Sequence, residues 1–209
     1  MKYRIKEAFR TLQGEGFHVG RAAVFVRFSG CNMWSGRDED RHRDAARHAN
    51  RCALFCDTDF VGGDALTAGQ VRDIAARHGA GSAVPIVLTG GEPLLQVDPE
   101  LVEALRETGA PLHVETNGTV LPRAALDWTT CSPKTAPSGL ALQACDELKV
   151  VVPAYDPSDY LGGIEARFLY VQAEDGPMLI ENTAAAVAFV QANPTWRLSV
   201  QTHKFINIP

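Results

Sequence analysis

Short runs of β-branched and aromatic residues alternate along the chain with longer amphipathic stretches. Three stretches have helical periodicity, at 66–79, 98–109 and 177–193; the first two end on Gly and the third runs into Asn-Pro. Regular alternation of strands and helices favours a parallel sheet with right-handed crossovers. Seven runs are predicted strands, at residues 22–29, 84–89, 111–116, 126–132, 147–152, 167–172 and 197–202.

Polar segments that follow the predicted strands decide between two α/β folds. TGGEP (89–93), ETNG (115–118), SPK (132–134) and QAED (172–175) each stand at the carboxyl end of a strand. Polar groups at the ends of several strands are typical of barrel active sites. About six or seven strand–helix units are too few for a full eightfold barrel. We therefore predict a partial, open (β/α) barrel of about six to seven parallel strands, in one domain over residues 1–209. A flat doubly wound sheet is the alternative.

Composition excludes few function classes. Hydrophobic residues make up 45% of the chain, charged residues 22%, and the formal net charge is −5. This balance gives no reason to expect nucleic acid and leaves a small anionic or zwitterionic ligand open. The start of the chain lacks the apolar region of a secretory signal, and no apolar run approaches the roughly eighteen residues that a membrane span needs. We expect a cytoplasmic protein without a membrane partner.

The chain contains five cysteines: Cys31, Cys52, Cys56, Cys131 and Cys145. In a reducing compartment they are expected to be core residues or metal ligands before disulfides. Cys31 follows the first predicted strand, and Cys52 and Cys56 have C-x3-C spacing. Three thiolates suit a zinc site that lacks a fourth ligand, or a four-iron cluster with one iron open. Incidental buried cysteines are the alternative.

Seven motifs occur in order along the whole chain: FRTLQGEG (9–16), FVRFSGCN (25–32), CDT (56–58), TGGEP, ETNG, SPK and QTHKFINIP (201–209). Together they resemble the 7-carboxy-7-deazaguanine synthase family of radical S-adenosylmethionine enzymes. The superfamily pattern is C-x3-C-x2-C, whereas this chain has C-x20-C-x3-C. We interpret residues from about 32 to 51 as an inserted cluster loop, whose charge pattern is typical of an exposed helix.

The resemblance implies that Cys31, Cys52 and Cys56 hold three irons of a [4Fe-4S] cluster, and that the fourth iron binds S-adenosylmethionine. Two of the implied cofactor contacts have alternatives: Phe55 as a core residue, and Glu92 as a structural residue of a turn. The implied cofactor-binding residues are Phe55, Gly91, Glu92, Ser132, Pro133, Lys134, Gln172, Ala173, Glu174 and Asp175.

The resemblance also implies a substrate, 6-carboxy-5,6,7,8-tetrahydropterin, and a product, 7-carboxy-7-deazaguanine, with release of ammonia. The strand period places Arg27 on the same side as Phe25, where its guanidinium suits a carboxylate. Thr58 is the implied Mg2+ ligand, while Asp57 has turn capping as an independent role. The implied substrate-binding residues are Leu12, Gln13, Gly14, Arg27, Thr89 and Pro209, the last through its carboxylate.

For partners, the resemblance implies a homodimer. A basic stripe in the insert is either a solvated face or a docking site for an acidic, flavodoxin-type electron donor. It consists of Arg41, Arg43, Arg47 and Arg51. Two other functions stay open: an activase that makes a glycyl radical on a partner protein, and a non-catalytic zinc-binding module.

Overall fold

The computed structural model describes residues 1–48 and 56–209, which build one nine-stranded sheet with the order β3-β1-β2-β4-β5-β6-β7-β8-β9. β2 and the strands from β4 to β9 run parallel, while β1 pairs antiparallel with both β2 and β3. The strands are β1 Tyr3–Leu12, β2 Ala22–Phe28, β3 Asp64–Leu66, β4 Ile86–Gly90, β5 Leu112–Thr116, β6 Trp128–Cys131, β7 Ala144–Val152, β8 Glu165–Ala173 and β9 Trp196–Ser199.

All seven predicted strands are present, and the open partial barrel is confirmed. β1 and β3 were not predicted. The register of β1 against β2 shifts between Ile5 and Glu7, so the alternation of buried and exposed residues is interrupted there. A bulge of this kind removes the period-2 signal on which strand prediction depends.

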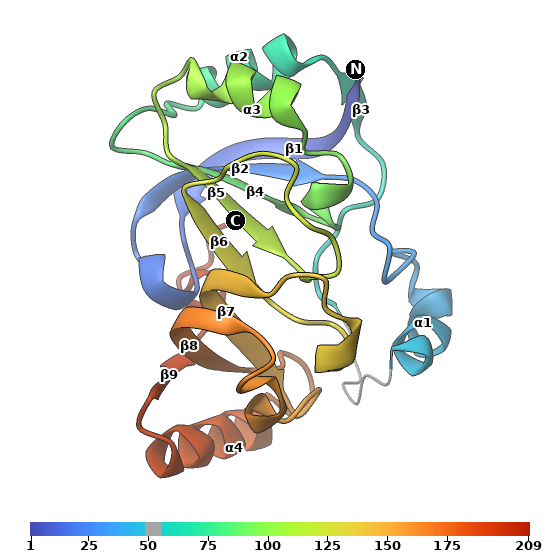
Figure 1. Ribbon diagram of the computed structural model, residues 1–209, viewed down its shortest axis with the longest axis vertical. Coiled ribbons are helices and arrows are strands. Elements are labelled where there is room, and N and C mark those ends of the chain that lie inside the picture. The colour runs from blue at the N-terminus through green and yellow to red at the C-terminus, as the bar shows by residue number, and fades with distance from the viewer. Residues whose placement is uncertain (49–55) are drawn as a thin grey trace.

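Helices cover the outer face of the sheet. α2 (Ala68–Arg77) and α3 (Pro99–Arg106) pack over the first half, and α4 (Leu179–Ala192) packs over the second half, at opposite ends of the view in Figure 1. Val24, Val26 and Phe28 of β2 belong to the core under α2 and α3, whereas Phe25 and Arg27 face an inner cavity. Helices on one face and a cavity on the other distinguish this fold from a doubly wound sheet.

Local capping fixes where the helices begin. α2 starts with a reciprocal capping box between Thr67 and Gln70. At the start of α3, Asp98 accepts hydrogen bonds from the Leu101 amide at 3.0 Å and from the Tyr3 hydroxyl at 2.7 Å, which joins the helix to β1. Two short helices, α1 (Arg41–Arg47) and α5 (Thr202–Phe205), complete the described part. No described helix is long and apolar enough to cross a membrane.

Stacked rings fill the barrel at the amino ends of its strands. Phe17, in the connection from β1 to β2, lies 4.3 Å from the Phe168 ring and 5.1 Å from the Trp128 ring. His18 lies beside them, 4.7 Å from His113 and 4.3 Å from Trp128 between ring centroids. We call these five residues the aromatic plug. It closes the amino end of the barrel and leaves the carboxyl end for a site.

We predict that protonation of His113 destabilises the fold. Burial, followed by the charge interactions with His18 and Arg21, lowers the pKa of His113 to about 4, although Asp127 and Asp146 oppose this. An unfolded histidine titrates near pH 6.5, so the unfolded chain binds more protons between these values. The free energy of unfolding should therefore fall by about 2 kcal/mol from pH 7 to pH 4 through this group.

Urea unfolding at several pH values tests this on the wild-type protein and on His113→Gln. The substitution should flatten the pH dependence between pH 4 and 6.5, whereas His42→Gln, on the exposed side of α1, should not. Equal slopes for the wild type and His113→Gln would contradict the role of His113.

Candidate active site

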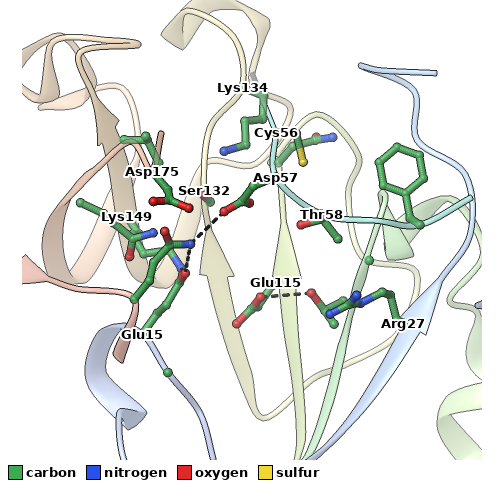
Figure 2. A pocket seen from close by; sticks show the side chains of 18 of the residues that line it. Glu15, Arg27, Cys56, Asp57, Thr58, Glu115, Ser132, Lys134, Lys149 and Asp175 are labelled. Atoms are coloured by element: carbon green, nitrogen blue, oxygen red, sulfur yellow. Dashed lines mark hydrogen bonds and ion pairs between the residues drawn. The ribbon is translucent and has the colours of Figure 1, made fainter. Parts of the chain in front are cut away.

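A cavity of about 290 Å3 lies at the carboxyl end of the barrel. Residues from β1, β2 and β7, from the loops after β2, β4, β5, β6 and β8, and from the carboxyl-terminal segment line it. Figure 2 shows Glu15 and Lys149 on one side and Arg27 and Thr58 on the other, with Cys56 between them at the upper rim. The size and mixed polarity of the cavity suit a small molecule that carries charge.

The cavity brings together nearly all predicted site residues that the structure describes. Cys52, Phe55 and Arg51 lie outside the described residues. Glu92 is described but is not part of the lining. The predicted residues that line the cavity are Leu12, Gln13, Gly14, Arg27, Cys31, Cys56, Thr58, Thr89, Gly91, Ser132, Pro133, Lys134, Gln172, Ala173, Glu174, Asp175 and Pro209.

Cys31 and Cys56 are both free, half-buried thiols at the rim of the cavity. The Met33 amide donates a hydrogen bond to Cys31 Sγ at 3.4 Å. Burial raises the pKa of Cys31, so the uncomplexed thiol stays protonated until a metal replaces its proton. Thiol ligands with amide donors to sulfur are the surroundings that iron–sulfur clusters use. The donor set therefore fits a cluster, although the described residues contain no complete group of three metal ligands of the His, Cys, Asp or Glu type.

The loop after β4 lies directly against the loop of Cys31. Gly91 N donates to Phe28 O at 3.0 Å, and Glu92 N donates to Gly30 O at 2.9 Å. Gly90 has φ of +113°, and a Cβ on Gly91 would collide with the carbonyl oxygen of Gly30. The two glycines are therefore required by this close backbone approach. Their contact brings a predicted cofactor-binding position next to a predicted cluster ligand.

Glu92 has a structural role in this arrangement. Its side chain is fully buried, and its carboxylate accepts hydrogen bonds from Asn117 N at 2.8 Å, Thr116 Oγ1 at 2.8 Å and Leu94 N at 3.0 Å. These bonds use the carboxylate to join the ends of β4 and β5. Glu92 is not part of the cavity lining, so the expected contact of its side chain with a cofactor stays a prediction.

Arg27 presents an incompletely satisfied guanidinium at the cavity. Its Nη1 lies 2.9 Å from Glu7 Oε1, and its Cζ lies 5.5 Å from the centre of the Phe9 ring. Its Nε is buried and has no hydrogen-bond partner within the described part of the chain. A buried N–H without a partner is costly, so this atom favours an acceptor such as a ligand carboxylate.

Lys149 stands at the centre of a buried charge network. It is paired with Glu15 and its side chain is 5% exposed. Burial alone would lower the pKa of Lys149, but the charges of Glu15, Glu115 and Glu147 raise it well above its ordinary value. Burial raises the pKa of Glu15, but the charge of Lys149 together with the hydrogen bonds from Lys149 and Gln201 brings that pKa below its ordinary value, so both partners are ionised.

Glu115 extends this network towards the wall of β4. Its carboxylate accepts hydrogen bonds from Gln13 Nε2 at 2.9 Å and from Thr89 Oγ1 at 3.1 Å, the latter drawn in Figure 2. Two predicted substrate-binding residues, Gln13 and Thr89, are therefore held by the same carboxylate. Their side chains are oriented before any ligand binds.

The carboxyl-terminal segment lies across the cavity. Lys204 Nζ is 2.6 Å from both Asp57 Oδ2 and Asp175 Oδ2, and Gln201 Nε2 is 3.1 Å from Asp57 Oδ2. Burial raises the pKa of Asp57, but its bonds with Lys204 and Gln201 hold that pKa well below the usual range. Asp57 therefore anchors this segment beside Cys56. At the end of the chain, Pro209 O accepts from Thr11 Oγ1 at 3.0 Å.

Sequence reasoning missed several polar residues of this cavity. Lys149 lines the cavity, and Glu147 lies two residues before it on the same strand face, because both alternate with the core residues Leu148 and Val150. Their charges were the available signal. The tail residues Gln201, His203 and Lys204 also line the cavity, but a chain end gives no local pattern that predicts where it packs.

No family model matches the chain. Three curated proteins named 7-carboxy-7-deazaguanine synthase align with it over the full length of both chains. They come from Bradyrhizobium diazoefficiens with 47% identity over 217 residues, Burkholderia multivorans with 45% over 219 residues, and Caulobacter vibrioides with 43% over 218 residues. A crystal structure of QueE from Escherichia coli is 27% identical with a TM-score of 0.70, covering 97% of this chain and 95% of the other.

We predict that Lys149 is required for stability. Lys149→Met leaves three buried carboxylates without their cation, so the free energy of unfolding should fall by about 3–5 kcal/mol. Adding Glu15→Gln removes one of these charges, so the double variant should recover about 1–3 kcal/mol. Urea unfolding at pH 7 measures both values.

Lys2→Met is the matched control, because Lys2 is exposed and its loss should change stability by no more than about 0.5 kcal/mol. If Lys149→Met changes stability as little as Lys2→Met does, the network does not hold the fold together.

Proposed function

Because the chain belongs to the 7-carboxy-7-deazaguanine synthase family, we propose that it converts 6-carboxy-5,6,7,8-tetrahydropterin into 7-carboxy-7-deazaguanine with release of ammonia. It is a radical S-adenosylmethionine lyase of queuosine and deazapurine biosynthesis. Residues 1–209 act as one domain with an inserted cluster loop at about 32–51. The observation that carries the proposal is that two cluster-type thiols and the unsatisfied Arg27 guanidinium line the same cavity.

The cofactors are an iron–sulfur cluster and S-adenosylmethionine. When bound, they supply a carbon-centred radical that abstracts a hydrogen atom from the substrate. Cys31, Cys52 and Cys56 hold the cluster as a [4Fe-4S] centre, and Glu92 fixes the loop that carries Gly91. Residues that contact S-adenosylmethionine are Phe55, Gly91, Glu92, Ser132, Pro133, Lys134, Gln172, Ala173, Glu174 and Asp175.

For the substrate, the chain supplies position and charge. Arg27 binds the carboxylate, because its Nε lacks an acceptor and a guanidinium matches two carboxylate oxygens. The ring is held by Leu12, Gln13, Gly14, Thr89 and Pro209. The tail that Lys204 fastens to Asp57 and Asp175 limits water at the reacting atoms.

We assign Mg2+ to the hydroxyl of Thr58, which lines the cavity next to Asp57. Asp57 is engaged by Lys204 and Gln201, and the described residues offer no cluster of three metal-binding side chains. Magnesium retains water readily and prefers oxygen ligands. Substrate oxygens and water would therefore complete its coordination.

The proposed electron donor is of the flavodoxin type. Charge steering by α1 contributes little, since Arg41 pairs with Asp38, Arg43 with Asp40 and Asp44, and Arg47 with Asp44. The three described arginines of the basic stripe are thus paired with Asp44 of α1 and with Asp38 and Asp40 directly before it.

A homodimer is the proposed assembly. Apolar side chains are exposed along β9 and α5, which form one edge of the sheet and the segment after it. They are Leu198, Val200, Phe205 and Ile206, with exposed fractions from 37% to 74%. An exposed edge strand beside apolar side chains favours contact with a second copy.

Anaerobic reconstitution with iron and sulfide tests the activity. The wild-type protein should bind both and form the deazaguanine from the carboxylated pterin when S-adenosylmethionine is present. Cys31→Ala and Cys56→Ala should lose cluster and product, whereas Cys145→Ala, at a buried thiol outside the cavity, should keep both. Bound zinc without sulfide would favour the zinc module, and a cluster without turnover would favour the activase.

A second prediction concerns Arg27. Removing a charge-assisted hydrogen bond costs about 1.5–3 kcal/mol, so Arg27→Gln should raise the KM for the carboxylated substrate roughly ten- to hundredfold. Inhibition by a tetrahydropterin without the carboxylate should be similar in variant and wild type. Steady-state kinetics measure both, with the exposed Arg10→Gln as control. Equal loss of affinity for both pterins would contradict a carboxylate-binding role.

A further inference from the structure

One arginine of the insert contacts the backbone of a cysteine. Arg41, the first residue of α1, donates from Nη1 to the carbonyl oxygen of Cys56 at 2.7 Å. Its Nη2 lies 2.7 Å from Asp38 Oδ1, and its Cζ lies 4.5 Å from the centre of the Trp34 ring. The side chain is only 17% exposed, so three contacts of different kinds fix its guanidinium.

A small apolar cluster, built by residues of the insert together with Phe60, packs against the described cysteines of the site. Met33, Trp34, Ala45 and Phe60 form a small buried cluster, and Cys31 and Cys56 pack against it. The Trp34 and Phe60 rings meet edge to face at 5.4 Å. The inserted segment is therefore part of the thiol environment. Arg41 is the most buried of the described arginines of α1, since Arg43 and Arg47 have side chains 53% and 65% exposed, and the buried Asp44 is paired with both of these.

A fixed positive charge at this place has an electrostatic consequence. Reduction adds negative charge to an iron–sulfur cluster, and a nearby cation stabilises the added charge. Asp38 carries the opposing charge, but its side chain is 90% exposed, so solvent screens it more strongly than the half-buried guanidinium. The net effect of the pair at Cys56 is positive.

We propose that Arg41 is a positioning residue for the iron–sulfur cluster: it fixes the Cys56 backbone and raises the reduction potential of the cluster. This inference rests on the proposed function, in which Cys56 is a cluster ligand. It gives the inserted segment a role in electron uptake: the chain carries its own cation beside the thiol.

The test is a redox titration of the reconstituted protein followed by electron paramagnetic resonance. Arg41→Gln should shift the potential to a more negative value, equivalent to about a tenfold smaller ratio of reduced to oxidised cluster, or 59 mV for one electron. Asp38→Asn should shift it in the opposite direction by a smaller amount. Arg41→Lys should keep most of the potential, and Arg47→Gln should match the wild type.

Opposite shifts at Arg41 and Asp38 are expected from charge and not from general loosening of the loop. If wild-type protein binds the cluster and turns over, but Arg41→Gln has the potential of Arg47→Gln, this inference alone is wrong. If Arg41→Gln retains no cluster, Asp38→Asn decides, and an unchanged or more negative potential there overturns it. A wild-type protein without iron and sulfide would instead overturn the proposed function.

Discussion

A single buried ammonium group, that of Lys149, holds together parts of the chain that lie far apart in sequence. It pairs with Glu15 from the connection after β1, and Gln201 from the carboxyl-terminal segment donates to the same carboxylate at 3.0 Å. Gln201 in turn contacts Asp57, which follows a predicted cluster ligand. Burying this many charges is tolerable only when they compensate one another. The geometry of the cavity therefore depends on this balance.

The apolar cores alone would not define the site. One core packs α2 and α3 against the first strands, and the other packs α4 against the last strands. Between them the inner face of the barrel is polar, and hydrogen bonds cross it from strand to strand. Glu92 joins β4 to β5 in this way, and Glu115 joins β5 to both β4 and the Gln13 turn. Polar contacts of this kind specify one arrangement because each has a fixed geometry.

Some features of the fold and of the site could be predicted from the sequence pattern, and others depend on tertiary packing. Regular alternation was sufficient for the seven parallel strands, and motifs at strand ends were sufficient for most of the cavity lining. The bulge in β1 interrupted its alternation, so that strand was missed. The hydrogen bond that Glu92 accepts from the amide of Asn117 could not be predicted, because it is set by the packing of β4 against β5. The tail contacts of Lys204 likewise depend on tertiary structure.

The aromatic plug determines how ligands enter and leave the cavity. The rings of Phe17, Trp128 and Phe168 close the amino end of the barrel. Within the described residues, the cavity therefore opens only at the carboxyl end of the strands. The substrate that enters the cavity and the ammonia that is released inside it must therefore pass through the same opening.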